Sequence, residues 1–343
     1  MDSIVYEMSG YAMYGSYLPS IASELQACTE RVRVAFEPRH DPSSRRSQVA
    51  RRDTNTHGTH MTDPAQNAEL ALLLEVAGTP KPGNVDRHRD LPDLRFEHFL
   101  AGAVGARDGL DLAASGAAVG PAFERAVEGM AAQEGGNTQF GALLLLVPLV
   151  RAARDDLSQP VVESVLEGTT VSDAAAFYRS FEHVDVFVSD PPERMEPLDV
   201  RRGADAIPAL EERGLTLLDV MDRSVPGDDV AREWVTGFDR SFTAAERLAA
   251  ADGPILERTA AVFLSLLAER SDTLVAKRHG EDVAAEATER AAALSERDAL
   301  ETDREVVEAF ADELVDRGVN PGTTADVTVA GLFIALEHET ITL

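Results

Sequence analysis

The sequence contains two lysines among basic side chains that are otherwise arginines and histidines. Of the 32 lysines and arginines, only Lys81 and Lys277 are lysines. Lys81 lies between Pro80 and Pro82. Because proline fixes its own backbone and biases the residue before it toward extended conformations, this loop should hold the amine in one direction. A compact ammonium group suits phosphate, so we interpret both lysines as binding residues; ordinary surface lysines are the alternative interpretation.

Both lysines lie in segments rich in glycine, proline, asparagine and aspartate. These residue types either permit tight turns or offer oxygen and amide groups to a ligand, and functional residues are often carried by such loops. The four segments are EVAGTPKPGNVDRHRD (75–90), GGNTQFG (135–141), SDTLVAKRHG (271–280) and NPGTTAD (320–326). We therefore expect the functional site to be built from them.

The second and fourth segments each precede an apolar stretch that should be helical. In the second segment, Asn137 is a candidate N-cap behind two glycines. A helix that begins in this way presents free backbone N–H groups and the positive end of its dipole, and both favour phosphate. The fourth segment predicts a second anion site for the same reason.

The sequences TPKPGNVD, GGNTQFG, DTLVAKRHG and NPGTTAD resemble the four signature segments of the triphosphoribosyl-dephospho-CoA synthase family, in the same order and with comparable spacing. The resemblance covers residues 65–336. It implies an all-α fold and an enzyme that transfers the triphosphoribosyl group of ATP to the ribose 2′-hydroxyl of 3′-dephospho-CoA, with release of adenine. In the family, the product is a prosthetic-group precursor for citrate lyase or malonate decarboxylase.

The reaction implied by the resemblance is a substitution at C1′ of the ATP ribose, through an oxocarbenium-like state. Electrostatic stabilisation and placement should supply most of the rate, and a carboxylate should take the proton of the attacking hydroxyl. The matched segments make Asp86 and Asp326 the leading carboxylates and add Lys81 to the catalytic set. A helix cap is the alternative role for Asp86, and a first-turn acid favoured by the dipole is the alternative for Asp326.

The triphosphate must be neutralised locally in so acidic a protein. We expect Mg²⁺ held by carboxylates, and the matched segments give Asp86, Glu75 and Asp272 as its ligands. The division of metal-binding and base roles among these carboxylates stays open. The residues expected to contact the nucleotide are Lys81, Asn137, Thr138, Lys277, Asn320 and Gly322. For the asparagines, Thr138 and Gly322, a structural role at a helix start is the alternative.

The sequence also departs from the family pattern. Gln139 stands where the family has histidine, Thr323 and Thr324 stand in a glycine-rich segment, and the stretch at 87–90 reads RHRD. These changes keep a nucleotide site credible but leave the acceptor open. The alternatives are a related ATP-dependent transferase with a different acceptor, and a helical nucleotide-binding protein without catalysis.

Helical periodicity dominates the chain from residue 67 onward, because apolar residues recur at spacings of three and four. One helix should end at Gly78, and further helices are predicted at 94–114, 119–133, 138–153, 172–184, 204–213, 230–238, 255–268, 282–297 and 303–317. The stretch HVDVFVSD (183–190) is the best strand candidate, or an extended connection. Pro191, Pro192 and Pro197 then mark a loop that could separate two helical halves.

Composition limits the classes of function. The chain has 343 residues, 44% hydrophobic content and a formal charge of −28, with its acids spread along the sequence. An acidic surface with few lysines is what we expect in the cytoplasm of a salt-loving archaeon, and it disfavours nucleic acid as a partner. No apolar run approaches a membrane span, and a single cysteine disfavours a structural zinc site. The oligomeric state, including a homo-oligomer, stays open.

Residues 1–60 differ from the rest of the chain. They hold seven arginines and seven acids, and they end in a basic, polar run with too few apolar residues to bury. We predict a poorly ordered extension over 1–60 and one helical domain over 61–343. A sharper hypothesis is that natural translation begins at Met61, and native peptides from residues 1–60 in mass spectrometry would contradict it.

Overall fold

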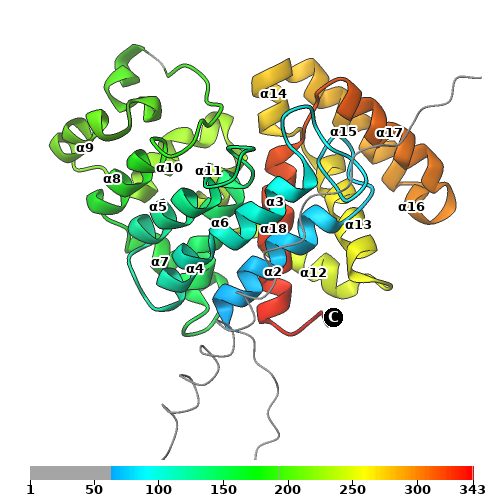
Figure 1. The fold of residues 1–343 in the computed structure, drawn as a ribbon, viewed down its shortest axis with the longest axis horizontal. Helices are drawn as coiled ribbons and strands as arrows, with labels where there is room; N and C mark the ends of the chain where they lie inside the picture. The colour runs from blue at the N-terminus through cyan, green and yellow to red at the C-terminus, as the bar shows by residue number, and fades with distance from the viewer. Residues whose placement is uncertain (1–62, 192, 342) are drawn as a thin grey trace, which may run out of the picture. The chain divides into compact units, whose positions relative to one another are not determined.

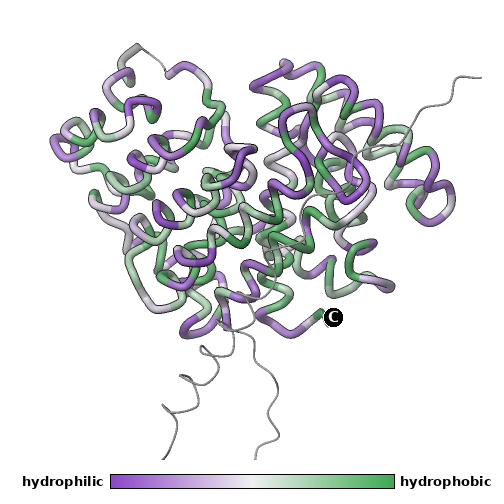
Figure 2. The backbone as a smooth tube through the Cα atoms, viewed as in Figure 1, coloured by the Kyte–Doolittle hydropathy of each residue, from purple (hydrophilic) through white to green (hydrophobic). Residues whose placement is uncertain are grey.

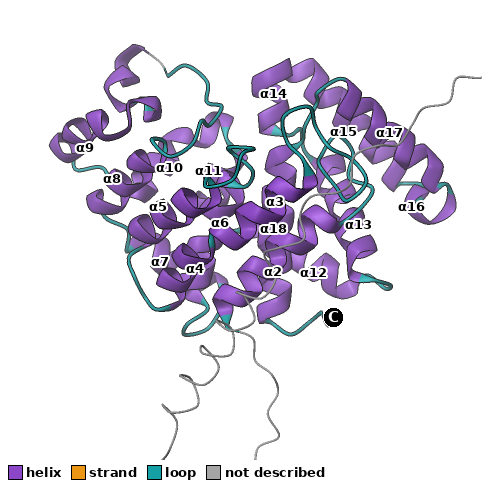
Figure 3. Cartoon of the chain, viewed as in Figure 1, coloured by secondary structure: helices purple, strands orange, loops and turns teal. Residues whose placement is uncertain are grey.

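Helices and the loops between them make up the part of the chain that the structure describes (Figure 3). The computed structural model describes residues 63–191, 193–341 and 343. Within these residues there is no β-strand, only an isolated bridge between Asp86 and Arg89. The predicted all-α fold is therefore confirmed. The extension predicted over residues 1–60, and the translation start predicted at Met61, lie outside the described residues.

Two helices with little polar sequence, α6 (Phe140–Ala152) and α18 (Gly322–Glu337), form the centre of the helical unit (Figures 1 and 2). A helix that is apolar on every side must be covered by its neighbours. Helix α18 packs against α6, α2 (Pro64–Ala77) and α12 (Asp239–Ala250). From Thr323 to Ala335, every residue of α18 except Asp326 is buried. Asp326 is partly exposed because a cavity, described below, reaches α18 at this residue.

Further helices cover α6 and its neighbours. Helices α4, α5 and α7 pack on α6, while α3 and α8 pack on α5. Their bounds are α3 (Phe96–Gly105), α4 (Arg107–Ala114), α5 (Val119–Met130), α7 (Gln159–Glu167) and α8 (Val171–Ser180). The helices α3 and α5 approach closely at Gly105 and Gly129, where a Cβ on either glycine would lie within 2.2 Å of the other's carbonyl oxygen. The glycines therefore permit this contact.

The remaining segments lie at two ends of the helical unit. One group follows α8 and contains η1 (Glu193–Leu198), η2 (Val200–Ala206), α9 (Ile207–Arg213), α10 (Leu217–Ser224), η3 (Val225–Gly227) and α11 (Asp229–Val235). The other contains α13 (Ile255–Glu269), α14 (Thr273–His279), α15 (Glu281–Ser295), α16 (Ala299–Thr302) and α17 (Arg304–Asp316). The second group has its own smaller apolar core around Phe263, Val275 and Phe310. Among the described helices, none has the length and apolar character that a membrane crossing requires.

Most predicted helices are present, with shifted ends. The helix predicted at 94–114 is divided at Ala106 into α3 and α4, and the short helices α7, α10, α12 and α14 were missed. The strand candidate at 183–190 is an extended loop. Its alternating valines do not meet a partner strand; Val186 and Val188 instead line the cavity described below. Phe187 and Ser189 line the same cavity, so the alternation of apolar residues does not indicate a sheet here.

Candidate active site

The four loop segments singled out in the sequence converge on one cavity of about 1120 Å³. Each segment contributes to the lining: Glu75 from the first, Asn137 from the second, Lys277 from the third and Asp326 from the fourth. Helices α6, α10, α11, α14 and α18 supply the surrounding walls. Glu75 and Asp326, which are separated by 251 positions in the chain, are thus brought to the same cavity.

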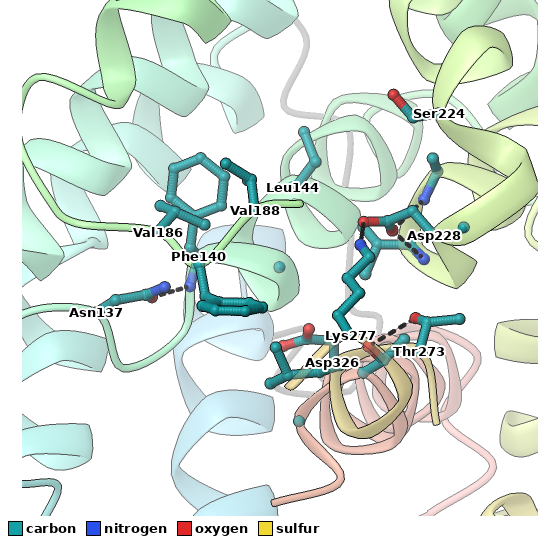
Figure 4. A pocket seen from close by; sticks show the side chains of 18 of the residues that line it. Asn137, Phe140, Leu144, Val186, Val188, Ser224, Asp228, Thr273, Lys277 and Asp326 are labelled. Atoms are coloured by element: carbon teal, nitrogen blue, oxygen red, sulfur yellow. Dashed lines mark hydrogen bonds and ion pairs between the residues drawn. The ribbon is translucent and has the colours of Figure 1, made fainter. Parts of the chain in front are cut away.

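Asp326 lies at the middle of this cavity, with Phe140 and Asn137 on one side and Lys277 and Thr273 on the other (Figure 4). Its carboxylate is pressed against the start of α6: a Cβ at Gly141 would lie 2.1 Å from Oδ2 of Asp326. Asp326 is partly exposed to the cavity, but the surrounding protein removes most of its contact with water, and this desolvation raises its pKa well above 3.8; the negative charges of nearby carboxylates add to the effect. A carboxyl group whose pKa is raised toward neutrality is suited to exchange protons with a substrate.

Three carboxylates repel the charge on Asp326. They belong to Asp272, Glu75 and Asp228, and the backbone N–H of Ala142, which donates to Asp326, offsets the repulsion in part. Of the three, Glu75 and Asp228 line the cavity together with Asp326. The N-terminus of α6, predicted as an anion site, thus already faces a carboxylate of the protein itself.

Lys277 forms an ion pair at the other side of the cavity. Its Nζ donates to Oδ2 of Asp228 at 2.7 Å (Figure 4). The other carboxylate oxygen of Asp228 accepts from the N–H groups of Val230 and Ala231 and so caps α11. Lys277 is in the last turn of α14, where the helix dipole favours a cation. The amine is therefore held in place at the cavity wall.

The structure does not bring the Lys81 amine into the cavity. The side chain is completely buried, and its Nζ donates to Glu75 and, at 3.1 Å, to Oδ1 of Asn84. Nζ also lies 5.8 Å from the centre of the Phe263 ring. Glu75 and Asn84 line the cavity whereas Lys81 does not. The Lys81 side chain is thus held behind the cavity wall, where it contacts two side chains that line the cavity.

The Asp86 carboxylate is hydrogen-bonded to residues of its own loop. Its carboxylate accepts from Oγ1 of Thr79 at 2.8 Å, from the N–H of Lys81 at 3.3 Å, from the N–H of His88 at 2.8 Å and from Arg89 at 3.0 Å. It is fully buried and does not line the cavity. A charged carboxylate with this many donors stabilises the fold of the loop, so the structure favours the structural role that the sequence left open.

Asp272 connects two helix starts. One oxygen accepts from the N–H groups of Leu274 and Val275 and caps α14, and the other accepts from the N–H and the hydroxyl of Thr324 at 2.7 and 2.8 Å. The anion site predicted at the start of α18 is thus filled by this carboxylate. Asp272 is buried and does not line the cavity.

The predicted metal ligands are accordingly not assembled around one point. Only Glu75 of the predicted set Glu75, Asp86 and Asp272 lines the cavity. Across residues 63–191 and 193–341, no group of three or more histidine, cysteine, aspartate or glutamate side chains is placed to hold a metal ion.

The predicted nucleotide contacts other than Lys81 all line the cavity. They are Asn137, Thr138, Lys277, Asn320 and Gly322. Asn137 Oδ1 accepts from the N–H of Phe140 at 3.1 Å, so this asparagine also supports the start of α6. Asn320 Oδ1 accepts from Nδ2 of Asn84 at 2.9 Å. These bonds connect the second segment to its helix and the fourth segment to the first.

Sequence reasoning missed Arg223 and Arg278, which line the same cavity as Lys277. Arg278 follows Lys277 directly, and its guanidinium lies 4.9 Å from the ring centre of Phe187. Arg278 was missed because the sequence argument relied on the rarity of lysine, and arginines are common in this chain. Arg223 is at the end of α10, a helix whose short amphipathic sequence was not recognised.

Comparison with known proteins agrees with this geometry. The sequence profile of ATP:dephospho-CoA triphosphoribosyl transferase matches residues 61–342. The chain belongs to this family. It is thus a transferase that moves a triphosphoribosyl group from ATP to dephospho-CoA.

A solved structure supports the membership. It is the crystal structure of a protein assigned as triphosphoribosyl-dephospho-CoA synthase from Archaeoglobus fulgidus, which is similar to this transferase with a TM-score of 0.56 and 27% sequence identity. The similarity covers 71% of this chain and 98% of that chain. Among curated proteins, no sequence matches the transferase.

The departures from the family pattern now have structural explanations. Thr323 contacts Oγ1 of Thr273 at 3.1 Å, and Thr324 bonds to Asp272, so both threonines join the third and fourth segments of the transferase. Arg89 of the RHRD stretch binds Asp86 within its loop. Gln139 is buried at the cavity wall, and its Nε2 has no hydrogen-bond partner within the described residues. Of these residues, Gln139 and Thr323 line the cavity.

Proposed function

We propose that Asp326 is the catalytic base of the transfer of the triphosphoribosyl group from ATP to the ribose 2′-hydroxyl of dephospho-CoA. The observation that carries the proposal is the position of its carboxylate, which has a raised pKa, in the one cavity that all four segments line. A carboxylate whose pKa is raised is more basic than an ordinary aspartate, so it is better able to accept the proton of the hydroxyl.

In the proposed reaction, the oxygen of the acceptor 2′-hydroxyl forms a bond to C1′ of the ATP ribose while the bond from C1′ to the adenine nitrogen breaks. The electron pair of that bond leaves with adenine, which takes up one proton. Asp326 receives the proton that the hydroxyl loses, adenine takes its proton from water, and Asp326 then returns its proton to water, so protons and charge balance. Near the carboxylates of Asp326 and Glu75, positive charge developing on the ribose is stabilised electrostatically.

Lys277, Arg223 and Arg278 supply the positive charge for the triphosphate. They are the three lysine or arginine side chains of the lining, against the five carboxylates of Glu75, Asp199, Asp228, Glu281 and Asp326. The lining is thus negative before ATP enters, and a triphosphate would be repelled unless it carries a cation of its own.

Mg²⁺ bound to ATP fits this balance of charge. Magnesium is usually held by one or two carboxylates together with substrate phosphates and water, so it needs no cluster of three protein ligands. Glu75 and Asp228 are the lining carboxylates that would hold it beside the triphosphate. Bound there, the ion neutralises phosphate charge. Lys81 supports this arrangement from behind, because its amine fixes the Glu75 carboxylate.

The test is release of adenine by the full chain incubated with ATP, MgCl₂ and dephospho-CoA. We expect adenine and a product with the mass of dephospho-CoA plus the triphosphoribosyl group in equal amounts, dependence on both nucleotides, and loss of activity in EDTA that added Mg²⁺ restores. Asp326→Asn should release adenine at a rate lower by roughly 10²-fold or more. Wild-type activity in this variant would contradict the assignment of the base.

A further inference from the structure

The cavity has two chemically different sides. In Figure 4, Leu144, Val186 and Val188 lie together on the side of Phe140, and Lys277 with Asp228 lies across from them. Asp326 is between the two sides. We call the first side the apolar arm and define it by Leu144, Phe181, Val186 and Val188, all of which line the cavity; the Phe181 ring contacts that of Phe140.

We propose that the apolar arm binds the pantetheine chain of dephospho-CoA, an inference that rests on the proposed function. Dephospho-CoA consists of an adenosine diphosphate and a long, uncharged chain of methylene, methyl and amide groups. ATP has no such part. Burial of apolar groups against the arm is favourable. A triphosphate would lose its hydration there, and the side chains of the arm carry no charge to replace it.

The position of Lys277 sets the orientation of both substrates. Lys277 lies across the cavity from Val186 and Val188 in Figure 4, whereas Arg278 lies 4.9 Å from the ring centre of Phe187, which is in the same loop as these valines. The triphosphate is therefore directed to the side of Lys277, and the chain of the acceptor to the side of Val186. The two riboses then meet at Asp326, where the proposed transfer occurs.

The volume of the cavity agrees with two occupants. A site for one drug-sized ligand usually measures roughly 300–1,000 Å³. The cavity of about 1120 Å³ exceeds this range. It also has an aromatic side chain with exposed area at its edge, since Phe187 is 44% exposed and stacks against Arg278.

The apolar arm is backed by a rigid aromatic group. The ring centre of Phe181 lies 4.9 Å from that of Phe140 and 5.2 Å from that of Phe177, and Phe123 lies 5.1 Å from Phe140. Edge-to-face contacts of this kind fix the ring positions. A preformed apolar surface loses little conformational entropy when a flexible chain binds to it.

The experiment introduces a charge into the arm. Val186→Asp and Val188→Asp are suited to this purpose because both valines are half-buried on a loop and not in a helix core. The control is Val306→Asp, the same change at a residue of α17 that is 39% exposed and lies outside the cavity. Far-UV circular dichroism and thermal melting of each variant establish that it is folded.

In steady-state assays of adenine release by the full chain, we expect either arm variant to raise KM for dephospho-CoA by roughly tenfold or more. KM for ATP should change less than about twofold, as should both constants in Val306→Asp. With ADP as a shortened acceptor, which lacks the pantetheine chain, the arm variants and the wild type should be equally active. An unchanged KM for dephospho-CoA, or a rise in KM for ATP instead, would overturn the proposal.

Calorimetric binding of dephospho-CoA distinguishes failure of this inference from failure of the proposed function. If the wild type releases no adenine but binds dephospho-CoA, and the arm variants lose that binding, the proposed function is wrong and the apolar arm assignment stands. If wild type and arm variants bind dephospho-CoA equally well, the assignment of the arm is wrong whatever the activity.

Discussion

The carboxylate of Asp326 in α18 lies so close to Gly141 in α6 that a Cβ at position 141 would come within 2.1 Å of it. The two residues come from segments that are separated by 185 positions, yet each determines where the other can be. Glycine is required at this point because no other residue lets the backbone of α6 approach the carboxylate so closely. The position of the proposed base therefore depends on the second segment as well as on the fourth.

Gly141→Ala should displace the Asp326 carboxylate. Because a shift of about 1 Å at a reacting group can cost roughly 10²-fold in rate, we expect a fall of this order in kcat for adenine release. Gly168→Ala is the matched control, since a Cβ there would approach only carbonyl oxygens at 3.2 Å or more, far from the cavity lining. Equal kcat values for the two variants would show that the close approach has no role in catalysis.

Asp326→Asn should gain stability while it loses activity. Since the pKa of Asp326 is raised in the folded protein, its contribution to stability is full below its unfolded pKa and is lost as the pH rises through the folded value. The free energy of unfolding, measured in urea at several pH values, should therefore exceed that of the wild type at neutral pH, with the difference shrinking toward pH 4. Wild-type kcat should rise as the pH increases through the raised pKa of Asp326. A variant less stable than the wild type at pH 7 would contradict this account of the burial.

Lys81→Met should destabilise the protein, because it leaves the buried Glu75 carboxylate without its partner. Removal of one member of a buried ion pair typically costs about 3–5 kcal/mol. The double variant Lys81→Met, Glu75→Gln should recover part of this free energy, which urea unfolding can measure. A single variant of wild-type stability and no activity would instead favour direct contact between Lys81 and the substrate, as the sequence suggested.

Lys277→Met and Arg223→Ala should each raise KM for ATP by roughly tenfold, since each removes a charge-assisted contact to phosphate. KM for dephospho-CoA should change much less. Arg297→Ala removes a positive charge from an exposed residue outside the cavity and should leave both constants unchanged. If ATP affinity follows the net charge of the protein, so that Arg297→Ala has the same effect, a specific phosphate site at Lys277 is ruled out.

The helices could be predicted from the sequence where the spacing of apolar residues and the positions of glycine and proline indicate the same helix. Helices α13 and α17 match their predicted ranges within about two residues, since a long apolar stripe determines them. Helices α10 and α14 are only eight and seven residues long, so each makes about two turns and shows too few repeats of the apolar spacing to be recognised. The loop at 183–190 shows that alternation alone cannot distinguish a strand from a wall of a cavity.

The sequence indicated which segments form the candidate site, but not which of their side chains reach the cavity. Composition and order of the four segments were enough to nominate Lys277 and Asp326, which both reach the cavity. No sequence signal separated these residues from Lys81, Asp86 and Asp272, which lie in the same segments. Their difference is the direction of the side chain, and that depends on distant partners such as Thr324 for Asp272.

The central claim is that both nucleotides share one cavity with their riboses at Asp326. The most direct measurement is a crystal structure of the full chain with ATP, Mg²⁺ and 2′-deoxy-dephospho-CoA, an acceptor that lacks the attacking hydroxyl. We predict the triphosphate beside Lys277, and C1′ of ATP and C2′ of the acceptor adjacent to the Asp326 carboxylate. A structure in which either nucleotide binds outside the cavity, or in which Asp326 contacts neither ribose, would contradict the claim.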